Sequence, residues 1–329
     1  MNVIQRPRER EFCATMRDYI IDTDRSITFS VDFNGKRILS ETYVPDADYQ
    51  VRIRKLGRFC ALALWGVWPT GDVTSQPNAS GTFAFYINDV KDFESFVIYS
   101  RLESRLEAAS VGVLSDTVQK VTRRGCHEYV SGFLQSGGRY TVSADFQDGH
   151  RETLDVVATG TDSTSAATLD VSVDSIEQRH NWSDIVRYSI AMSGGTSTFL
   201  VDQARYADVW QFRFKNNYDM PEVLTCTGQL KIVGANQSDT AAMYGIERKF
   251  GVKVTDEYTV KSGPIFLRAE YRLWHSLLNA QQASVWVDDR WLDIVITKQK
   301  LERSFNSGQF SGVEFSFRIA DPEQNNLIV

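Results

Sequence analysis

The side chains best suited to catalysis or metal binding are few in this chain and lie far apart. Its four histidines, at positions 127, 150, 180 and 275, fall in separate segments, and none has the His-x-x-x-His or His-Glu-x-x-His spacing of a metal site. The glycine-rich loop that cradles phosphates and the Gly-x-Ser-x-Gly turn of a hydrolase nucleophile are both missing. We therefore predict no catalytic residue, no cofactor, no metal site and no enzymatic activity.

Neighbouring acids and cysteines support the same interpretation. Acid pairs such as Asp288-Asp289 could bind calcium, but a calcium loop needs more oxygen ligands at set spacing. Turn formation explains such pairs better, because Asp side chains bond their own backbone in turns. The four cysteines are widely spaced and form no Cys-x-x-Cys pair, so we expect small, buried apolar residues in a reducing compartment.

Aromatic residues suggest a different chemistry, the binding of sugars. The chain has seven tryptophans and thirteen tyrosines, and Trp286 and Trp291 flank one expected hairpin. An aromatic face can stack on a pyranose ring, so this pair is the candidate for a glycan site. Aromatic residues more often fill cores and subunit contacts, which is the alternative explanation.

Charge and hydropathy limit the partners. The chain of 329 residues has 36 basic and 42 acidic residues, a net charge of −6, with no long cluster of Lys and Arg. This argues against binding to nucleic acid, which usually requires a basic surface. No apolar run has the length of a membrane span, and the first residues lack the apolar stretch of a signal peptide. We expect synthesis in a cytoplasm and no membrane partner.

The pattern of apolar residues predicts short antiparallel strands. Residues 27–33 alternate strictly between apolar and polar, and Asn34-Gly35 separates them from a second strand-like run at 36–43. Asn-Gly suits the type I′ turn that joins two twisted strands, so this is the strongest hairpin signal in the chain. Similar short runs follow with turn residues between them, which predicts a mainly β chain of tandem antiparallel β-sandwich domains.

The spacing of these runs predicts three domains. We expect an N-terminal β-sandwich at 1–108, an immunoglobulin-like or fibronectin-like sandwich at 109–205, and a C-terminal β-rich domain at 206–329. Within the last domain, residues 234–250 give no clear pattern and could form a long loop or a short helix.

One amphipathic helix is expected in the C-terminal domain, at 264–280. Ser262 can cap it, Pro264 can occupy its first turn, and its apolar face should include the four candidate interface residues Phe266, Leu273, Trp274 and Leu277. This face should bury against a sheet that contains the terminal strand at 313–319. Whether that sheet belongs to the same chain or to a neighbouring subunit stays open.

Four residue runs are specific beyond their alternation: ILSETYVPDAD at 38–48, GTFAFYIN at 81–88, FRFKNNYDMPE at 212–222 and EFSFRIAD at 314–321. Through these runs, most of the chain resembles tail-associated or baseplate-like structural proteins of phages and prophages of Bacteroidetes-type bacteria. No active-site residue is implied. The resemblance implies a β-sandwich protein that forms a ring or hub with copies of itself and with other virion proteins.

The sequence therefore leads to two hypotheses of different classes. The first is a non-enzymatic structural protein of a phage-type tail or baseplate, made in the cytoplasm and assembled into a particle. The alternative is a carbohydrate-binding or adhesin-like β-sandwich protein, for which Trp286 and Trp291 would stack on a glycan.

Overall fold

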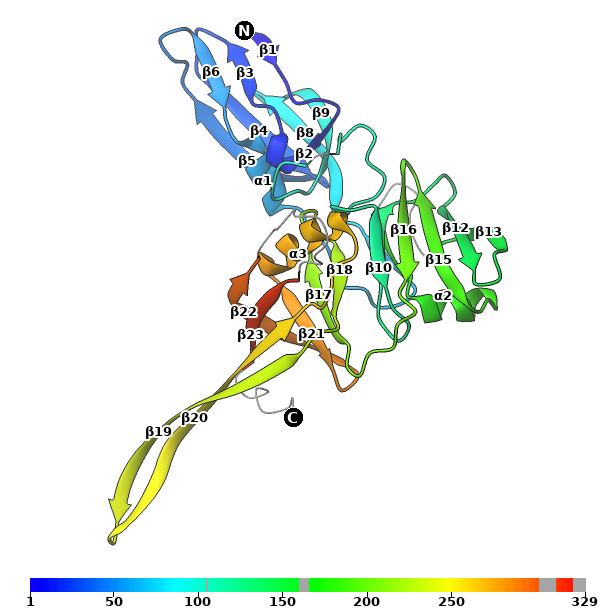
Figure 1. The fold of residues 1–329 in the computed structure, drawn as a ribbon. Coiled ribbons are helices and arrows are strands. Elements are labelled where there is room, and N and C mark those ends of the chain that lie inside the picture. Colours follow the sequence, from blue (N-terminus) through cyan, green and yellow to red (C-terminus); the bar gives the residue numbers. More distant parts are fainter. Residues whose placement is uncertain (105, 160–165, 302–311, 322–329) are drawn as a thin grey trace.

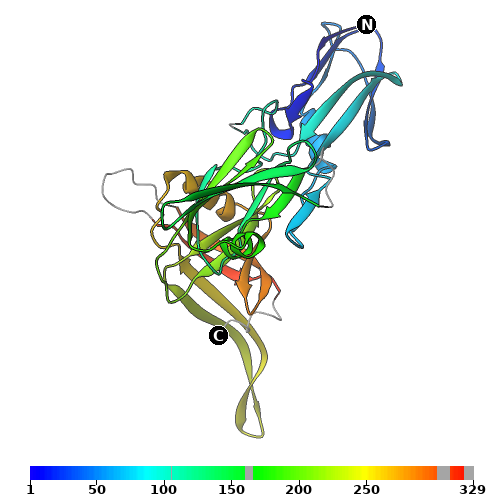
Figure 2. The ribbon, with the colours of Figure 1, turned by 90° about the vertical axis from the view of Figure 1, so that its right-hand side faces the viewer.

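The computed structural model describes residues 1–104, 106–159, 166–301 and 312–321. Two views show one β-sandwich at the N-terminal end, two further groups of strands in the middle, and a long hairpin that projects at the opposite end (Figures 1 and 2). Apart from the parallel pairs β2–β9 and β10–β16, neighbouring strands are antiparallel. The prediction of a mainly β chain of tandem β-sandwich domains is confirmed.

The N-terminal unit packs a three-stranded sheet against a five-stranded sheet. The first has the order β1-β3-β6, with β1 (Asn2–Gln5), β3 (Tyr19–Asp22) and β6 (Gln50–Ile53). The second has the order β2-β9-β8-β4-β5, with β2 (Arg10–Phe12), β4 (Ile27–Phe33), β5 (Lys36–Tyr43), β8 (Ser80–Ile87) and β9 (Val90–Ile98). Alternate residues of both sheets meet in one core, and the short helices η1 (Cys13–Thr15) and α1 (Leu56–Leu62) close its end.

The Asn34-Gly35 turn joins β4 to β5 as expected. Asn34 has φ 50° and Gly35 has φ 73°, the left-handed backbone that a type I′ turn requires. The register places Phe33 opposite Lys36, so the turn contains two residues. This hairpin prediction is confirmed.

The middle unit is a second sandwich. Its five-stranded sheet has the order β10-β16-β15-β12-β13, with β10 (Gln119–Thr122), β12 (Arg139–Phe146), β13 (Arg151–Val157), β15 (Ile185–Met192) and β16 (Gly195–Val201). The opposing sheet, of order β11-β14-β7, contains β11 (Tyr129–Phe133), β14 (Ala166–Asp170) and β7 (Val73–Gln76). Helix α2 (Val173–His180) follows β14 directly and packs Val173 and Ile176 into the core.

The domain limits remain a prediction, but one strand crosses the limit set at residue 108. Strand β7 lies in the stretch assigned to the first domain and pairs with β14 of the middle unit, Val73 opposite Leu169. A separate apolar cluster joins all three stretches and consists of Phe12, Ala79, Ile98, Val111, Leu114, Phe133, Ala166, Tyr218 and Met220. The first unit is therefore tied to the others by a shared strand and a shared core, which residue spacing could not reveal.

The C-terminal unit is built on one seven-stranded sheet. Its order is β18-β17-β21-β22-β23-β20-β19, with β17 (Trp210–Lys215), β18 (Pro221–Cys226), β19 (Leu230–Met243), β20 (Ile246–Lys261), β21 (Ala283–Val287), β22 (Arg290–Lys300) and β23 (Glu314–Ile319). Asp288 and Asp289, at φ 48° and 58°, form the tight turn expected between β21 and β22.

Residues 234–250, for which a long loop or a short helix was expected, belong to strands β19 and β20. The two strands pair from Leu230 opposite Val260 to Met243 opposite Ile246, and Tyr244-Gly245 make the turn at φ 55° and 79°. The expectation was wrong because both faces of this hairpin are exposed at its far end, so no alternation of apolar and polar residues marks the strands.

The C-terminal helix exists but is shorter than the predicted 264–280. Helix α3 spans Tyr271–Leu278 and follows the 3-10 turn η2 (Arg268–Glu270), whereas residues 264–267 are not helical. Side chains alternate along an extended segment, so Ile265 enters the core while Phe266 remains 45% exposed. The helical spacing that placed Phe266 on the buried face therefore does not apply there.

Candidate functional site

The residues suited to chemistry do not converge. Among the described residues, no three His, Cys, Asp or Glu side chains gather in a way that could hold a metal ion. The four cysteines are unpaired and buried, as expected, and burial raises the pKa of the Cys13 thiol to about 12. No helix in the described part of the chain is long and apolar enough to cross a membrane.

Three of the four candidate interface residues lie inside the C-terminal unit. Leu273, Trp274 and Leu277 are buried in one cluster with Phe315 and Phe317 of β23. The sheet that α3 covers therefore belongs to the same chain, which was one of the two open alternatives. Phe266, on the extended segment before η2, does not join them in this cluster.

Three charged residues form a buried cluster that sequence spacing did not indicate. Lys120 on β10 is 4% exposed, Glu128 before β11 is 2% exposed, and Glu222 on β18 is 5% exposed. The Lys120 Nζ lies 2.5 Å from Glu128 Oε1 and 3.4 Å from Glu222 Oε2. We call these three residues the buried triad. Because β10 and β18 belong to different sheets, the triad links the middle and C-terminal units.

Further hydrogen bonds hold the carboxylates of the triad. Glu222 Oε1 accepts from the Ser115 hydroxyl and, at 3.3 Å, from Asn216 Nδ2, while Glu128 Oε1 accepts from the Tyr129 N–H at 3.2 Å. Glu270 of η2 lies buried near the triad and accepts from the Val121 N–H at 2.7 Å. A cavity of about 10 Å³ adjoins Lys120 and Glu222 and has room for about one water. Water can therefore provide few hydrogen bonds to the buried charges.

The triad contains one ammonium and two carboxylates, so full ionisation would leave one buried negative charge without a counterion. Burial, with a smaller repulsion from Glu222, raises the pKa of Glu128 from 4.5 to about 7 despite the attraction of Lys120. Lys120 stays charged, because its two carboxylate neighbours raise its pKa against the effect of burial. Glu128 is therefore the residue of the triad that we expect to bind a proton near neutral pH.

This titration should make stability depend on pH. The folded protein binds the Glu128 proton more tightly than the unfolded chain, so protonation of Glu128 stabilises the fold. This stabilisation is complete below pH 4.5 and is lost as the pH rises through about 7. This difference in the pKa of Glu128 between the folded and unfolded states corresponds to about 3 kcal/mol of folding free energy. We expect Glu128→Gln, which is neutral at every pH, to remove this component when denaturant unfolding is measured between pH 5 and 8.

The comparison must be made between the two pH profiles, because other groups titrate in both proteins. The stability of the wild-type protein should fall relative to Glu128→Gln as the pH rises from 5 to 8. Parallel profiles would show that Glu128 does not change its charge in this range.

Trp286 and Trp291 form part of a cluster of aromatic and cationic side chains. They face each other across β21 and β22 with ring centroids 5.0 Å apart and planes inclined at 60°, and His127 lies 4.4 Å and 5.3 Å from their rings. The Arg213 guanidinium lies 4.9 Å from the Trp291 ring and 4.3 Å from the Trp68 ring. Trp286 and Trp291 are thus brought together as predicted, but they are half-buried between units and not a freely exposed pair.

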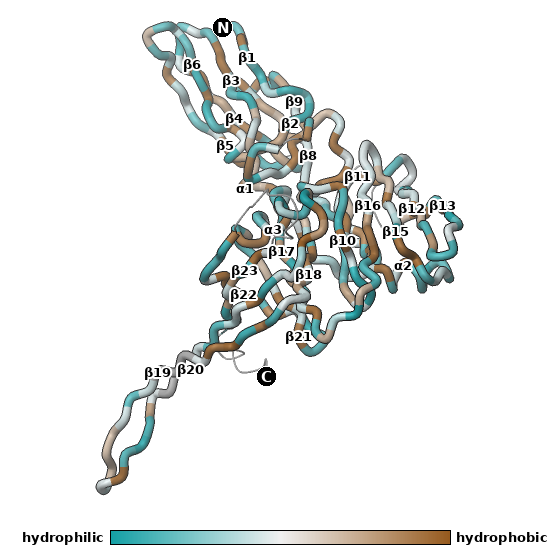
Figure 3. Tube along the Cα trace, viewed as in Figure 1, coloured by the Kyte–Doolittle hydropathy of each residue, from teal (hydrophilic) through white to brown (hydrophobic). Residues whose placement is uncertain are grey.

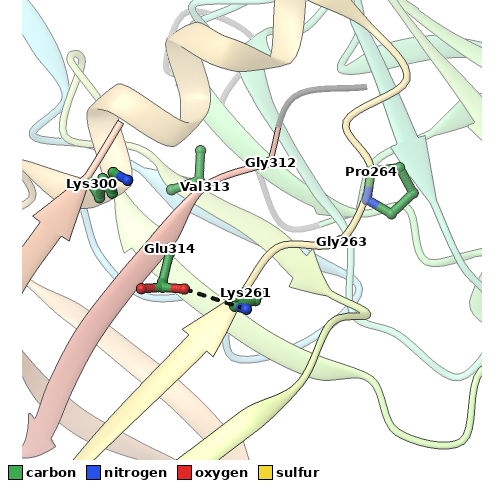
Figure 4. A pocket seen from close by; sticks show the side chains of 7 residues that line it. All are labelled: Lys261, Gly263, Pro264, Lys300, Gly312, Val313 and Glu314. Carbon is green, nitrogen blue, oxygen red and sulfur yellow. Dashed lines mark ion pairs between the residues drawn. The ribbon is translucent and has the colours of Figure 1, made fainter. Parts of the chain in front are cut away.

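A larger cavity lies at the base of the projecting hairpin. It has a volume of about 490 Å³ and lies where β20 and β22 end and β23 begins (Figure 4). Its described lining consists of Lys261, Gly263, Pro264, Lys300, Gly312, Val313 and Glu314, with Lys261 Nζ 3.7 Å from Glu314. These described residues include no nucleophile paired with a base.

The far end of the β19–β20 hairpin, residues 238–251, is exposed throughout. Strand β20 pairs with β23 through Tyr258–Lys261, so its residues 246–257 extend about 40 Å past that pairing, at about 3.3 Å per residue. We call this part of β19 and β20 the arm. Both brown, apolar segments and teal, polar ones lie in its far half (Figure 3).

One face of the arm tip carries apolar side chains together with Arg248 and Asp239. Residues directly opposite in an antiparallel pair share a face, and this face holds the pairs Met243 and Ile246, Ala241 and Arg248, and Asp239 and Phe250. Met243, Ile246 and Phe250 are each more than half exposed, and Tyr244 in the turn is 99% exposed. Glu247 and Lys249 lie on the other face, opposite Ala242 and Thr240.

Comparisons with known proteins do not identify the chain. No family model and no curated protein matches it. Among solved structures, an I-band fragment of titin is similar over 79% of this chain and 92% of that chain, with 9% identity and a TM-score of 0.17. A score this low supports no conclusion about fold or function.

Proposed function

We propose that this chain is a non-enzymatic structural protein of a phage- or prophage-type tail or baseplate, which assembles with copies of itself and with other virion proteins. The observation that carries the assembly part of this proposal is the arm. The virion part rests on the resemblance of the four residue runs at 38–48, 81–88, 212–222 and 314–321.

The arm has little to stabilise it within one chain. An isolated two-stranded hairpin is marginally stable in water, and this one continues about 40 Å past the strand that supports it. Its tip exposes Met243, Tyr244, Ile246 and Phe250 together. Exposed apolar groups of this kind favour contact with a partner. Its free strand edges offer unpaired backbone N–H and C=O groups that a partner strand can bond.

The described residues favour a structural role over catalysis. Lys120 and Arg123 are held at the joint between units by ion pairs with Glu128, Glu222 and Asp202. The described lining of the larger cavity contains only lysine, glutamate, glycine, proline and valine side chains.

Light scattering on the purified full chain tests the assembly. We expect a particle heavier than the 37.3 kDa chain. The double variant Ile246→Ser/Phe250→Ser should lower the particle mass towards that of the monomer, because it removes two apolar side chains from the same face of the arm. The matched control is Glu247→Ser/Lys249→Ser, which changes the other face of the same strand. It should leave the mass unchanged.

Two outcomes would contradict the proposal. The proposed self-assembly would be contradicted if the wild-type chain stayed monomeric at the highest concentration attainable. Equal effects of the two double variants would show that the apolar face of the arm does not mediate it. The virion role has its own test, because neighbouring genes should encode tail-length or tape-measure-like proteins.

A further inference from the structure

The described part of the chain contains two buried lysines, and they differ in how their charge is neutralised. Lys120 lies between two glutamates. Lys215 on β17 is 3% exposed and forms no ion pair, and its Nζ donates one hydrogen bond, of 3.2 Å, to the Asp219 carbonyl. The Asp219 carboxylate accepts from the Gly66 N–H. The Asp219 carboxylate attracts Lys215 without forming an ion pair with it. Because a buried cation without an ion pair is costly, a bound anion would stabilise it.

Arg213 provides a second cation on the same face of β17. Residues two apart on a strand lie on one face about 7 Å apart, so Arg213 and Lys215 are neighbours. The Arg213 Nε donates to Ser284 Oγ at 3.2 Å, and within the described structure the two terminal nitrogens have no hydrogen-bond partner and no ion pair. A guanidinium with both terminal nitrogens available binds carboxylates in a bidentate manner.

Aromatic rings surround the two cations. The Trp68 ring lies 4.3 Å from the Arg213 guanidinium and 4.7 Å from Lys215 Nζ. The Trp291 ring also contacts the Arg213 guanidinium, at 4.9 Å. Trp286 and His127 complete the cluster. Trp68 is fixed by its own loop, because Gln76 bonds both the N–H and the carbonyl of Val67.

All three stretches of the chain contribute to this cluster. Trp68 comes from the loop before β7, His127 from the loop before β11, and Arg213, Lys215, Trp286 and Trp291 from the C-terminal sheet. Arg213, Trp68, Trp286, Trp291 and His127 are half-buried, so part of each reaches solvent. A ligand can therefore reach Arg213 from outside while it contacts the indole rings, and Lys215 adds positive charge from its buried position.

We propose that this cluster is a binding site for an acidic saccharide, in which Arg213 binds a sugar carboxylate, the buried Lys215 adds positive charge, and the tryptophans contact the pyranose ring. The two unpaired cations select for negative charge, and the three indole rings favour a sugar over an acidic peptide, because indole faces stack on pyranose rings. The inference goes beyond the assembly role and does not depend on the arm.

Trigalacturonate and its neutral trimethyl ester are a matched pair of probes. We expect a saturable change in tryptophan fluorescence of the full chain with trigalacturonate, and none with the ester. Arg213→Met should weaken binding by about tenfold or more, since a charge-assisted bidentate contact is lost. Arg213→Lys, which keeps the charge without the planar fork, should weaken it less. The control Trp65→Phe changes a tryptophan outside the cluster and should bind as the wild type does.

Each other result would overturn the assignment. The proposed site would be contradicted by the absence of saturable binding, by an equal response to the ester, or by an unchanged affinity in Arg213→Met. Acetate binding as tightly as trigalacturonate would show a simple anion site, and tighter binding of a glutamate-rich peptide would assign the cluster to a protein partner. Thermal unfolding of each variant shows whether it is folded. If Arg213→Met does not fold, the affinity of Arg213→Lys still tests the role of the guanidinium.

Discussion

Lys120→Met is expected to lower the free energy of unfolding by about 3–5 kcal/mol at pH 8, because it leaves the carboxylates of Glu128 and Glu222 buried without their shared counterion. The methionine keeps most of the length of the side chain but removes its charge. Loss of Lys120 also removes the attraction that lowers the pKa of Glu128, so protonation of Glu128 should offset part of the loss and the loss should grow as the pH rises. Denaturant unfolding followed by tryptophan fluorescence measures the loss.

Lys91→Met is the matched control for this prediction. Lys91 pairs with Glu94 at the surface, where both side chains are about half exposed and solvent screens their attraction, so its loss should lower stability much less than Lys120→Met does. If Lys120→Met fails to fold, the triple variant Lys120→Met/Glu128→Gln/Glu222→Gln should fold, because it has no unpaired charge. Equal losses in Lys120→Met and Lys91→Met would contradict the account of the triad.

Trp274→Ala is expected to lower the free energy of unfolding by about 3–5 kcal/mol and to leave the mass of any assembly unchanged while the protein stays folded. The reason is that Trp274 on α3 is 3% exposed and packs in the core of its own chain with Phe315 and Phe317. Denaturant unfolding gives the stability, and light scattering gives the mass.

His275→Ala on the same helix is the control. His275 is exposed, so this change should alter stability by no more than about 0.5 kcal/mol. If Trp274→Ala instead kept its stability and lost its ability to assemble, α3 would be a subunit interface, as one of the two interpretations of the sequence held.

The buried triad and the arm serve different parts of the proposed role. The triad, with the apolar cluster around Tyr218 and Met220, fixes how the units sit against one another. Contacts of this kind between the units would hold the arm in a constant direction, which repeated contact between identical copies requires. The proposed saccharide site lies at a joint between units, so its geometry depends on the same contacts.

Local sequence predicted those features that depend on a few consecutive residues. Alternation at 27–33 and the Asn34-Gly35 turn predicted the first hairpin, because strand pairing and turn geometry are set within that segment. The apolar spacing of Leu273, Trp274 and Leu277 predicted one face of α3, since those residues are helical. The mainly β fold follows from many such segments.

Features that join distant segments could not be predicted in this way. Glu222 meets Lys120 across 102 positions, and Arg213 lies between Trp68 and Trp291 from two other segments. Phe266 departs from its expected face because Pro264 to Leu267 are extended, and the arm lacks the alternation that burial on one face produces. Residue type and spacing determined the strands, the turns and the apolar face of α3, because local backbone preferences and burial periodicity act over a few residues. The triad, the aromatic cluster and the direction of the arm arise only when the sheets pack, because packing sets which distant side chains lose their contact with water and must find partners.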